Sequence, residues 1–245
     1  MTLILGARCS DGVVIMTDMK ITSLVTGTPQ FLRYESKISG VFTNIIFGYA
    51  GDVETYEIYL NYGVGDVVRK RDDPNDVYTN DNFIHKLHEN MVKLRRVLAR
   101  NNKPLFLRIL VGRQFPRNKR SELHKVSSNF NPEIASIEAS IDNYAVIGDA
   151  ETCATELIKT RWKPDMRMGE FAELSYSVIR YIEEKGISAA VGLGLNKVPV
   201  RYLADIGNTD IALSNEEWEQ FKKTYQTYAD RFDKNTSPAC QDHGR

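Results

Sequence analysis

Thr2 has the residue type and position of an N-terminal nucleophile. It is the second residue of a chain of 245 residues, and removal of Met1 would free its α-amine. A threonine hydroxyl is a weak nucleophile, but a neutral α-amine on the same residue can accept its proton. The α-amine has an unperturbed pKa near ~8, so part of it is neutral at pH 7. Such a residue could attack an amide carbonyl, although many chains begin with Met-Thr by chance.

Asp18 and Lys37 are the charges that could tune such a nucleophile. Asp18 ends the apolar run Val13–Thr17, where a carboxylate is partly buried and needs a partner. Lys37 opens the next apolar strand and can be that partner. A lysine close to Thr2 would stabilise the alkoxide form of the Thr2 hydroxyl. It would also favour the neutral form of the Thr2 α-amine. A structural ion pair at a sheet edge explains the same pattern, and the pattern alone favours it.

A glycine-containing bend follows a strand and precedes a helix at Gly48–Asp52. Glycine lets the backbone approach a ligand closely, and a backbone N–H at such a bend could bind an oxyanion. A simple turn at the start of a helix is the alternative, with Asp52 as the residue that caps it.

The hydrophobic pattern predicts strands and helices that come in groups, without regular alternation of strand and helix. We expect strands at 2–9, 12–19, 36–41, 44–51, 105–112, 121–127, 133–139, 143–148 and 198–206. We expect helices at 52–70, 80–101, 150–161, 168–186 and 216–232, with Gly186 as the residue that follows the fourth helix.

These groups favour two antiparallel sheets packed face to face, with helices on the outer face of each. Strongly apolar strands need both faces covered, and this layering covers them. We expect one domain over residues 1–232 and a polar, flexible C-terminal tail at 233–245.

Composition argues against several other functions. The 32 basic and 32 acidic residues balance, so no general affinity for nucleic acid is expected. No apolar run reaches the length of a membrane span. The three cysteines are scattered, so we expect neither a disulfide framework nor a metal site. His85 and His88 lie three residues apart on an expected helix, but they have no third ligand nearby. We expect no metal, no cofactor and a cytoplasmic location.

Three blocks of the chain resemble proteasome β subunits and the bacterial HslV peptidase. They are Thr2–Gly6 with Gly12–Thr22, then Lys37-Ile38 with Ile45–Asp52, and finally Tyr144–Gly148. The first two blocks agree in residue type and in spacing, and the order of expected elements also agrees over residues 2 to about 213. The resemblance implies an α+β fold, the four-layer αββα sandwich of N-terminal-nucleophile (Ntn) hydrolases.

The resemblance also implies roles for individual residues. Thr2 would be the nucleophile, Asp18 and Lys37 would tune it, and the N–H of Gly48 would bind the oxyanion. The backbone of Thr22 and Ala50 would hold an extended peptide as an added strand. The apolar pocket for the residue before the cut would be lined by Ile21, Ile46 and Ala50.

Some positions depart from the family pattern. Asp149 stands where a serine is common, and Ser188 could replace an acid while Val191 cannot replace the accompanying serine. The gap between Asp18 and Lys37 is a few residues longer than usual, and a retained Met1 would block the Thr2 amine.

Three functions therefore stay open. The first is a threonine peptidase assembled with itself or with other subunits into a ring, acting on peptides or unfolded proteins, with an ATPase as a further partner. The second is an inactive structural subunit of such an assembly. The third is an Ntn amidase or transpeptidase that acts on another substrate.

Overall fold

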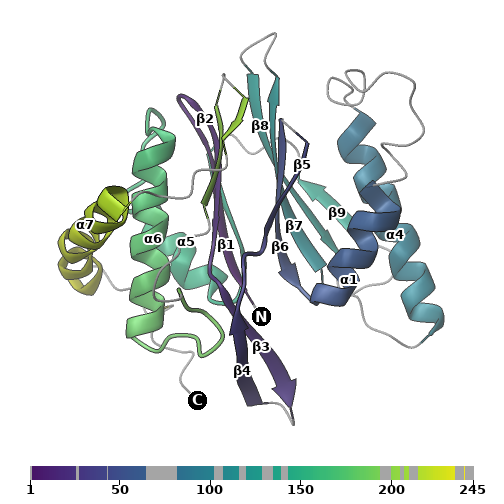
Figure 1. Cartoon of the computed structure of the whole chain (residues 1–245), viewed down its shortest axis with the longest axis horizontal. Helices are drawn as coiled ribbons and strands as arrows, with labels where there is room; N and C mark the ends of the chain where they lie inside the picture. The colour runs from purple at the N-terminus through teal and green to yellow at the C-terminus, as the bar shows by residue number, and fades with distance from the viewer. Residues whose placement is uncertain are drawn as a thin grey trace.

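Two five-stranded antiparallel sheets lie face to face in the computed structural model, with helices on the outer side of each (Figure 1). The structure describes residues 2–25, 28–42, 44–64, 82–101, 107–115, 120–128, 135–138, 143–193, 200–204, 207–209, 215–234 and 240.

The first sheet contains the start of the chain and has the order β10-β1-β2-β11-β12. Its strands are β1 (Leu3–Cys9), β2 (Gly12–Thr17), β10 (Tyr144–Gly148), β11 (Val200–Ala204) and β12 (Gly207–Thr209). β1 and β2 form the expected hairpin, with Cys9 opposite Gly12. β10 pairs with the other edge of β1, which places Gly148 opposite Leu3. The beginning of β1 is therefore held on both sides.

The second sheet has the order β5-β6-β7-β8-β9 and follows the chain from strand to strand. Its strands are β5 (Ile38–Phe42), β6 (Ile45–Gly51), β7 (Leu107–Phe115), β8 (Arg120–Ser128) and β9 (Ala135–Glu138). β7 and β8 are longer than the sequence pattern indicates. The register shifts between Gly40 and Phe42, so the β5–β6 hairpin contains an irregularity.

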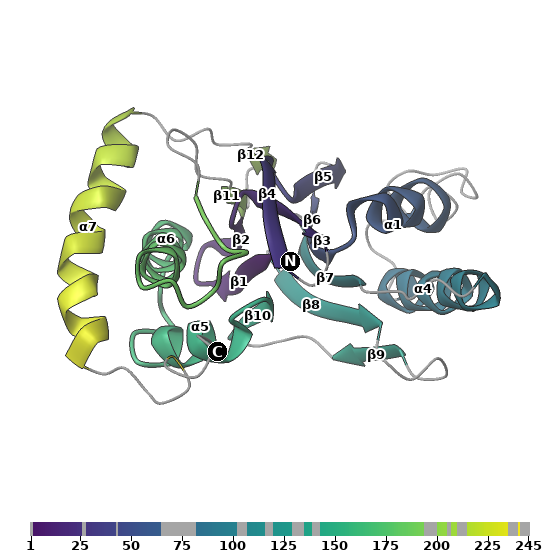
Figure 2. The same ribbon diagram turned by 90° about the horizontal axis from the view of Figure 1, so that it is seen from below.

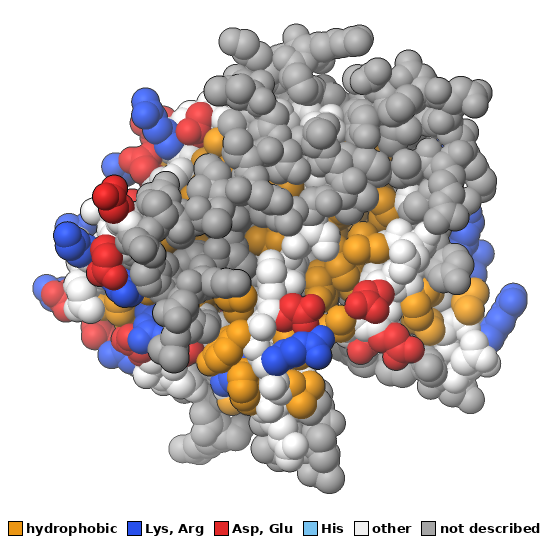
Figure 3. All heavy atoms as spheres, viewed as in Figure 1, with side chains coloured by type: hydrophobic (Ala, Val, Ile, Leu, Met, Phe, Trp, Pro, Cys, Tyr) orange, Lys and Arg blue, Asp and Glu red, His pale blue; other side chains and the backbone are white. Residues whose placement is uncertain are grey.

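A third, two-stranded sheet projects from the body between the two large sheets (Figure 1). It is formed by β3 (Lys20–Val25) and β4 (Thr28–Tyr34). The sequence analysis did not predict these strands, because the segment lacks an alternating apolar pattern. The large side chains exposed on β4 are Phe31 (52%), Leu32 (58%) and Tyr34 (46%). Figure 3 shows hydrophobic side chains on this hairpin and on the body just above it.

The helices cover the outer faces of both sheets. On the second sheet lie α1 (Val53–Ile58), the π-helical turn η1 (Tyr59–Val64) and α4 (Asn82–Arg100). On the first sheet lie α5 (Glu151–Lys159), α6 (Met168–Glu184) and α7 (Asn215–Lys234). Figure 2 shows α7 outermost, beyond α6. Within the expected helix at 52–70, α-helical geometry ends at Ile58 and π-helical geometry follows from Tyr59 to Val64. Residues 65–81 lie outside the described residues.

The helix ends follow the local sequence signals. Asp52 caps α1, since its carboxylate accepts the Thr55 N–H at 2.7 Å. Gly186 follows α6 with φ +64°, and the N–H groups of Gly186 and Ile187 bond to the carbonyls of Glu183 and Ile182. This pair of bonds is a Schellman motif, which glycine favours.

Strand β2 shows why its sequence is apolar throughout. Val13 and Ile15 pack between the two sheets, whereas Val14 and Met16 point to the helices outside the first sheet. Both faces of the strand are buried, as its continuous apolar run predicts. A third hydrophobic cluster lies between the second sheet and helices α1 and α4.

The expectation about cysteines was wrong. Cys153 on α5 forms a disulfide with Cys240, across a sequence separation of 87 residues. Cys9 is the buried free thiol. Their distant positions gave no sign of the pair, because the fold brings the C-terminal segment back to α5. Residues 235–239 and 241–245 of the expected tail lie outside the described residues.

Candidate active site

Thr2 lies at the buried start of β1, with 4% of its surface exposed. Its carbonyl accepts the Asp149 N–H at 2.6 Å, while the next carbonyl, that of Leu3, accepts the Asp18 N–H at 2.9 Å. Gly148 has φ +108°, and a Cβ atom there would lie 1.7 Å from the Thr2 carbonyl oxygen. Only glycine therefore fits at this position without displacing Thr2.

Asp18 and Lys37 form a fully buried ion pair beside the first residues of β1. Lys37 Nζ donates to Asp18 Oδ1 at 2.8 Å and to the Lys20 carbonyl at 2.7 Å. The side chains of Lys37 and Asp18 are 1% and 0% exposed. The chain thus places these two charges together, as predicted from the sequence.

Backbone N–H groups complete the shell around the Asp18 carboxylate. Oδ1 also accepts the Leu3 N–H at 2.9 Å, and Oδ2 accepts those of Lys20 at 3.1 Å and Gly192 at 3.4 Å. A buried carboxylate is tolerated only when it is paired and hydrogen-bonded in this way. Asp18 consequently ties together the starts of β1 and β3 and the segment after α6.

Burial and the ion pair shift the pKa of each of these two groups in opposite directions. Burial lowers the pKa of the Lys37 ammonium below its ordinary value, and the Asp18 carboxylate opposes that shift. Burial likewise raises the pKa of the Asp18 carboxyl, and Lys37 and the N–H groups of Leu3 and Gly192 oppose it. A lysine with a lowered pKa can exchange its proton more easily than an exposed lysine.

The segment Ser188–Gly192 closes the site on a second side. The Ser188 hydroxyl donates to the Asp149 carboxylate and accepts the Ala190 N–H at 3.1 Å. Lys20 Nζ donates to the Ala189 carbonyl at 2.7 Å. The structure therefore brings Thr2, Asp18, Lys37, Asp149 and Ser188 into one hydrogen-bonded group.

Gly48 lies on β6 opposite Ile38 and Leu110. A Cβ atom at Gly48 would lie 2.8 Å from Ile15 and 2.9 Å from Ile4, so glycine is needed where the two sheets pack. The N–H of the next residue, Tyr49, donates to the Lys37 carbonyl at 3.1 Å. Since successive amides of a strand point in opposite directions, the Gly48 N–H is directed toward β7.

The residues expected to bind substrate lie on β3 and β6. Ile21 is 9% exposed, and a register shift separates it from Thr22. Ala50 is 5% exposed, and its Cβ lies 3.4 Å from the position of a Cβ on Gly148, next to the Thr2 carbonyl. Ile46 is fully buried in the cluster between the sheets. Ala50 therefore lies close to the turn residue that packs against the Thr2 carbonyl.

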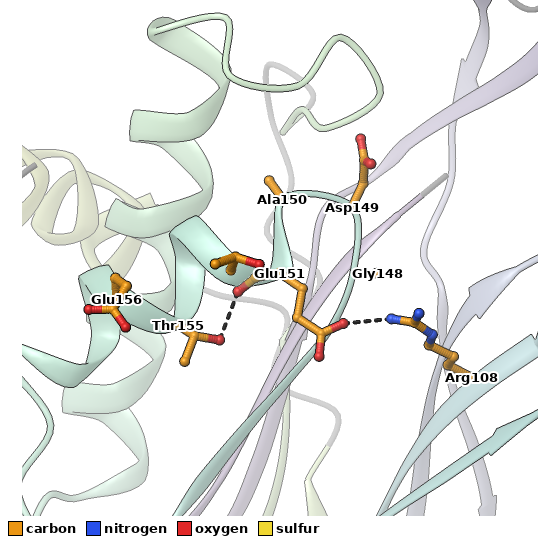
Figure 4. Close-up of a pocket in the computed structure, with 8 residues that line it drawn as sticks. Arg108, Gly148, Asp149, Ala150, Glu151, Thr155 and Glu156 are labelled. Atoms are coloured by element: carbon orange, nitrogen blue, oxygen red, sulfur yellow. Dashed lines mark hydrogen bonds and ion pairs between the residues drawn. The ribbon is translucent and has the colours of Figure 1, made fainter. Parts of the chain in front are cut away.

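A pocket of about 530 Å³ opens beside Asp149, at the N-terminus of α5 (Figure 4). It is lined by Arg108, Gly148, Asp149, Ala150, Glu151, Thr152, Thr155 and Glu156. Glu151 joins the two halves of the molecule, because its carboxylate pairs with Arg108 at 2.6 Å and Lys125 at 3.1 Å from the second sheet. The sequence analysis missed Arg108 and Glu151, since charges on distant elements give no sign of their pairing.

No group of three His, Cys, Asp or Glu side chains within the described ranges could hold a metal ion. His85 is exposed on α4 and His88 is half-buried there. No helix of the described part is long and apolar enough to cross a membrane.

The two facing antiparallel sheets and the helices outside them define an α+β protein, with a buried Asp–Lys pair next to residue 2. A model of the proteasome subunit family matches residues 2–192, and the chain belongs to that family. The resemblance read from the sequence and the α+β fold are therefore confirmed.

A solved structure of the Anbu (Gly-1) mutant from Hyphomicrobium sp. strain MC1 is similar, with a TM-score of 0.71. The similarity covers 96% of this chain and 96% of that chain, at 14% sequence identity. At this identity the likeness extends to the fold alone. No curated protein matches the chain.

Proposed function

We propose that the chain is a threonine-type Ntn peptidase that cleaves peptide bonds through an acyl-enzyme on Thr2 after Met1 is removed. The observation that carries this proposal is the buried Lys37–Asp18 pair, which is bonded at 2.9 Å to the amide that follows Thr2. A buried charge pair beside a residue with a weakly nucleophilic hydroxyl fits the activation that such a nucleophile needs.

In the first half of the proposed reaction, Thr2 Oγ attacks the substrate carbonyl while the Thr2 α-amine takes the hydroxyl proton. The tetrahedral intermediate collapses to an ester on Thr2, and the same proton passes to the leaving amine. Water then attacks the ester with the α-amine as base, which releases the carboxylic acid and restores Thr2. Lys37 stabilises the developing negative charge on Oγ and favours the neutral amine.

Gly48 stays our proposed oxyanion donor. Because its N–H is directed toward β7, this role requires β6 to reorient at Gly48 when substrate binds. Replacement of the amide by an ester at this position would test the donor directly, because it removes the N–H and keeps the glycine.

We also propose that the backbone of Thr22 and Ala50 holds an extended peptide, and that Ile21, Ile46 and Ala50 favour an apolar or neutral residue before the cut. The apolar character of these three side chains and the position of Ala50 close to Gly148, which lies against the Thr2 carbonyl, support this preference. A library of peptides that vary only at the residue before the cut would measure it.

The architecture and the assembly complete the proposal. We infer that the order of helices, sheet, sheet and helices is the four-layer αββα sandwich of a single domain over residues 1–232.

Membership of the proteasome subunit family supports assembly into a ring, of this chain alone or with other subunits, with an ATPase as a further partner. The exposed Phe31, Leu32 and Tyr34 on β4 would supply apolar contacts. A measurement of the mass of the native particle, compared with the 27.9 kDa of a single chain, tests this assembly.

A cytoplasmic location remains a prediction. The Cys153–Cys240 disulfide weighs against it, since disulfides persist mainly in oxidising compartments. Fractionation of cells that make the protein would decide between a cytoplasmic location and an oxidising compartment.

The first experiment on function is the intact mass of the purified protein before and after treatment with an electrophile that requires a free N-terminal threonine. We expect a mass that lacks Met1, and a single adduct on Thr2 that is absent from Thr2→Ala. A free Thr2 that takes no label, within an intact assembly, would instead point to an inactive structural subunit. Labelling without peptide cleavage would point to an amidase or transpeptidase.

A further inference from the structure

Thr17 carries a buried hydroxyl without a hydrogen-bond partner. Thr17 is the last residue of β2, directly before Asp18, and none of its surface is exposed. Its Oγ1 atom has no hydrogen-bond partner among the described residues. A buried polar group without a partner destabilises a fold, whereas an apolar side chain of the same shape would not. Such a group in a native structure needs an explanation, and a role in function is a reason to retain it.

The alternation of side chains along β2 directs Thr17 into the space between the two large sheets. Val13 and Ile15 pack between the sheets, whereas Val14 and Met16 face the helices outside the first sheet. Thr17 is two residues beyond Ile15, so its side chain points to the same face as Ile15. The unpartnered hydroxyl therefore lies between the sheets, at the end of the apolar cluster there.

Thr2 faces the same space from the neighbouring strand. On β1, Ile4 packs between the sheets and Leu3 faces the helices, so alternation places the Thr2 side chain on the inner face. Thr17 lies directly opposite Ile4 in the hairpin, while the bond from the Asp18 N–H to the Leu3 carbonyl belongs to the next pair. The pair of Thr17 and Ile4 is therefore non-hydrogen-bonded, the kind in which side chains approach most closely. Thr2 is then the diagonal neighbour of Thr17, at a Cα distance of roughly 7–8 Å and less between their Cβ atoms.

Ala50 of the second sheet borders this corner. It belongs to the same inter-sheet cluster as Ile4. Its Cβ atom lies 3.4 Å from the position of a Cβ on Gly148, which packs against the Thr2 carbonyl. The Thr17 hydroxyl consequently lines the space between Thr2 and the strand proposed to hold the substrate. A donor in this place can reach the reacting oxygen of Thr2 by rotation of the two threonine side chains.

We propose that the Thr17 hydroxyl is a catalytic hydrogen-bond donor to Thr2 Oγ while that oxygen carries negative charge. This role rests on the proposed function and adds a residue to the same site. As the Thr2 hydroxyl proton passes to the Thr2 α-amine, the Thr17 O–H bonds to the charged oxygen and keeps its own proton. The same donor assists when Oγ leaves the ester during hydrolysis. Because the bond is made to the developing charge, it speeds the chemical step and does not tighten substrate binding.

The test compares Thr17→Val, which keeps the shape of the side chain and removes the hydroxyl, with the original protein. We expect the rate constant for labelling of Thr2 at saturating electrophile to fall on the order of 10-fold or more, as for the loss of a hydrogen bond to a charged group. The electrophile concentration at half saturation should stay the same, because the bond is absent before reaction. The urea midpoint should stay equal or rise, since an unpartnered buried hydroxyl is removed. Thr17→Ser keeps the hydroxyl and should recover most of the labelling rate.

Ser175→Ala is the matched control, because Ser175 is fully buried on α6 and its hydroxyl likewise has no partner among the described residues. It should leave the labelling rate unchanged. Equal labelling rate constants in the original protein and in Thr17→Val would overturn the role of Thr17 and leave the peptidase standing. So would a lower urea midpoint in Thr17→Val, which would show that the hydroxyl is already bonded before reaction, or a slow Thr17→Ser. An original protein that lacks Met1 by mass and takes no label would overturn the proposed function, and the role of Thr17 with it.

Discussion

Lys37 donates to the Asp18 carboxylate at 2.8 Å across a sequence distance of 19 residues, with both side chains buried. The same ammonium bonds to the Lys20 carbonyl, and the same carboxylate bonds to the Leu3 amide. The pair therefore joins the start of β1 and the start of β3 to the residue that precedes β5. It has a structural role and a proposed catalytic role, which substitutions can separate.

Lys37→Met leaves Asp18 as an uncompensated buried charge, and we expect a loss of about 3–5 kcal/mol in the free energy of unfolding. Asp18→Asn with Lys37→Met removes both charges and keeps an oxygen that can accept the backbone N–H groups. We expect this double variant to recover most of the stability but to leave Thr2 unlabelled by the electrophile. Urea unfolding measures the first quantity and the labelling rate the second. A double variant that still takes label at the original rate would show that the pair is only structural.

Gly148→Ala should disturb Thr2 directly. The new Cβ would lie 1.7 Å from the Thr2 carbonyl oxygen, in a backbone conformation with φ +108° that alanine rarely adopts. We expect lower stability, by more than about 1–3 kcal/mol from the conformation alone, and slower labelling of Thr2. Gly169→Ala on α6 is the matched control, because a Cβ there meets no atom within 4 Å. Alanine is favoured over glycine in a helix by about 1 kcal/mol, so this variant should be unchanged or more stable.

The sequence predicted the parts of the site that depend on local pattern. Asp18 directly follows the buried strand β2 and Lys37 directly precedes β5, so each charge adjoins an apolar run and their partnership could be anticipated. Gly186 and Asp52 were also recognisable, since helix caps depend on a few neighbouring residues.

The parts that depend on the packing of distant segments were not predictable from the sequence. The contact between Ser188 and Asp149 joins residues 39 apart, and it exists only because the segment after α6 folds back toward the turn after β10 and the residues that follow β2. The β3–β4 hairpin was missed because its exposed side chains include Phe31 and Leu32, which conceal the usual alternation. The direction of the Gly48 amide likewise follows from strand register, which a single strand pattern does not specify.

Cys9 should be unreactive in the native protein. Burial raises the pKa of its thiol to about 12, with smaller contributions from the Asp11 and Glu170 carboxylates. The thiolate is the reactive form, so we expect negligible modification by an aromatic disulfide reagent at pH 8 and rapid modification in urea. Prompt reaction of the native protein at this pH, mapped to Cys9, would contradict the expectation.

The raised pKa of the Cys9 thiol also predicts how the free energy of unfolding changes with pH. The folded state keeps the Cys9 proton between the unfolded pKa of about 8.5 and the folded value, so it binds more protons than the unfolded chain in that range. Its contribution to stability is full below about pH 8.5 and declines as the pH rises toward 12. Cys9→Ala should therefore have a shallower decline in unfolding free energy above pH 9, by at most about 1.4 kcal/mol per pH unit. Identical slopes would exclude a contribution from this thiol.

Reduction of the disulfide between Cys153 and Cys240 should weaken the fold from its C-terminal end. The bond closes a sequence separation of 87 residues and connects α5 to the segment after α7. Closing a loop of this length restricts the unfolded chain, which can contribute up to about 4–5 kcal/mol in the chain-entropy model. We expect a lower urea midpoint with reductant and in Cys153→Ala/Cys240→Ala, and no further effect of reductant on that variant. Because α5 begins directly after the turn that contacts Thr2, the Thr2 labelling rate should be measured in parallel. An unchanged midpoint after complete reduction, verified by mass, would mean that the α5 packing around Ala154, Leu157 and Ile158 holds this region without the disulfide.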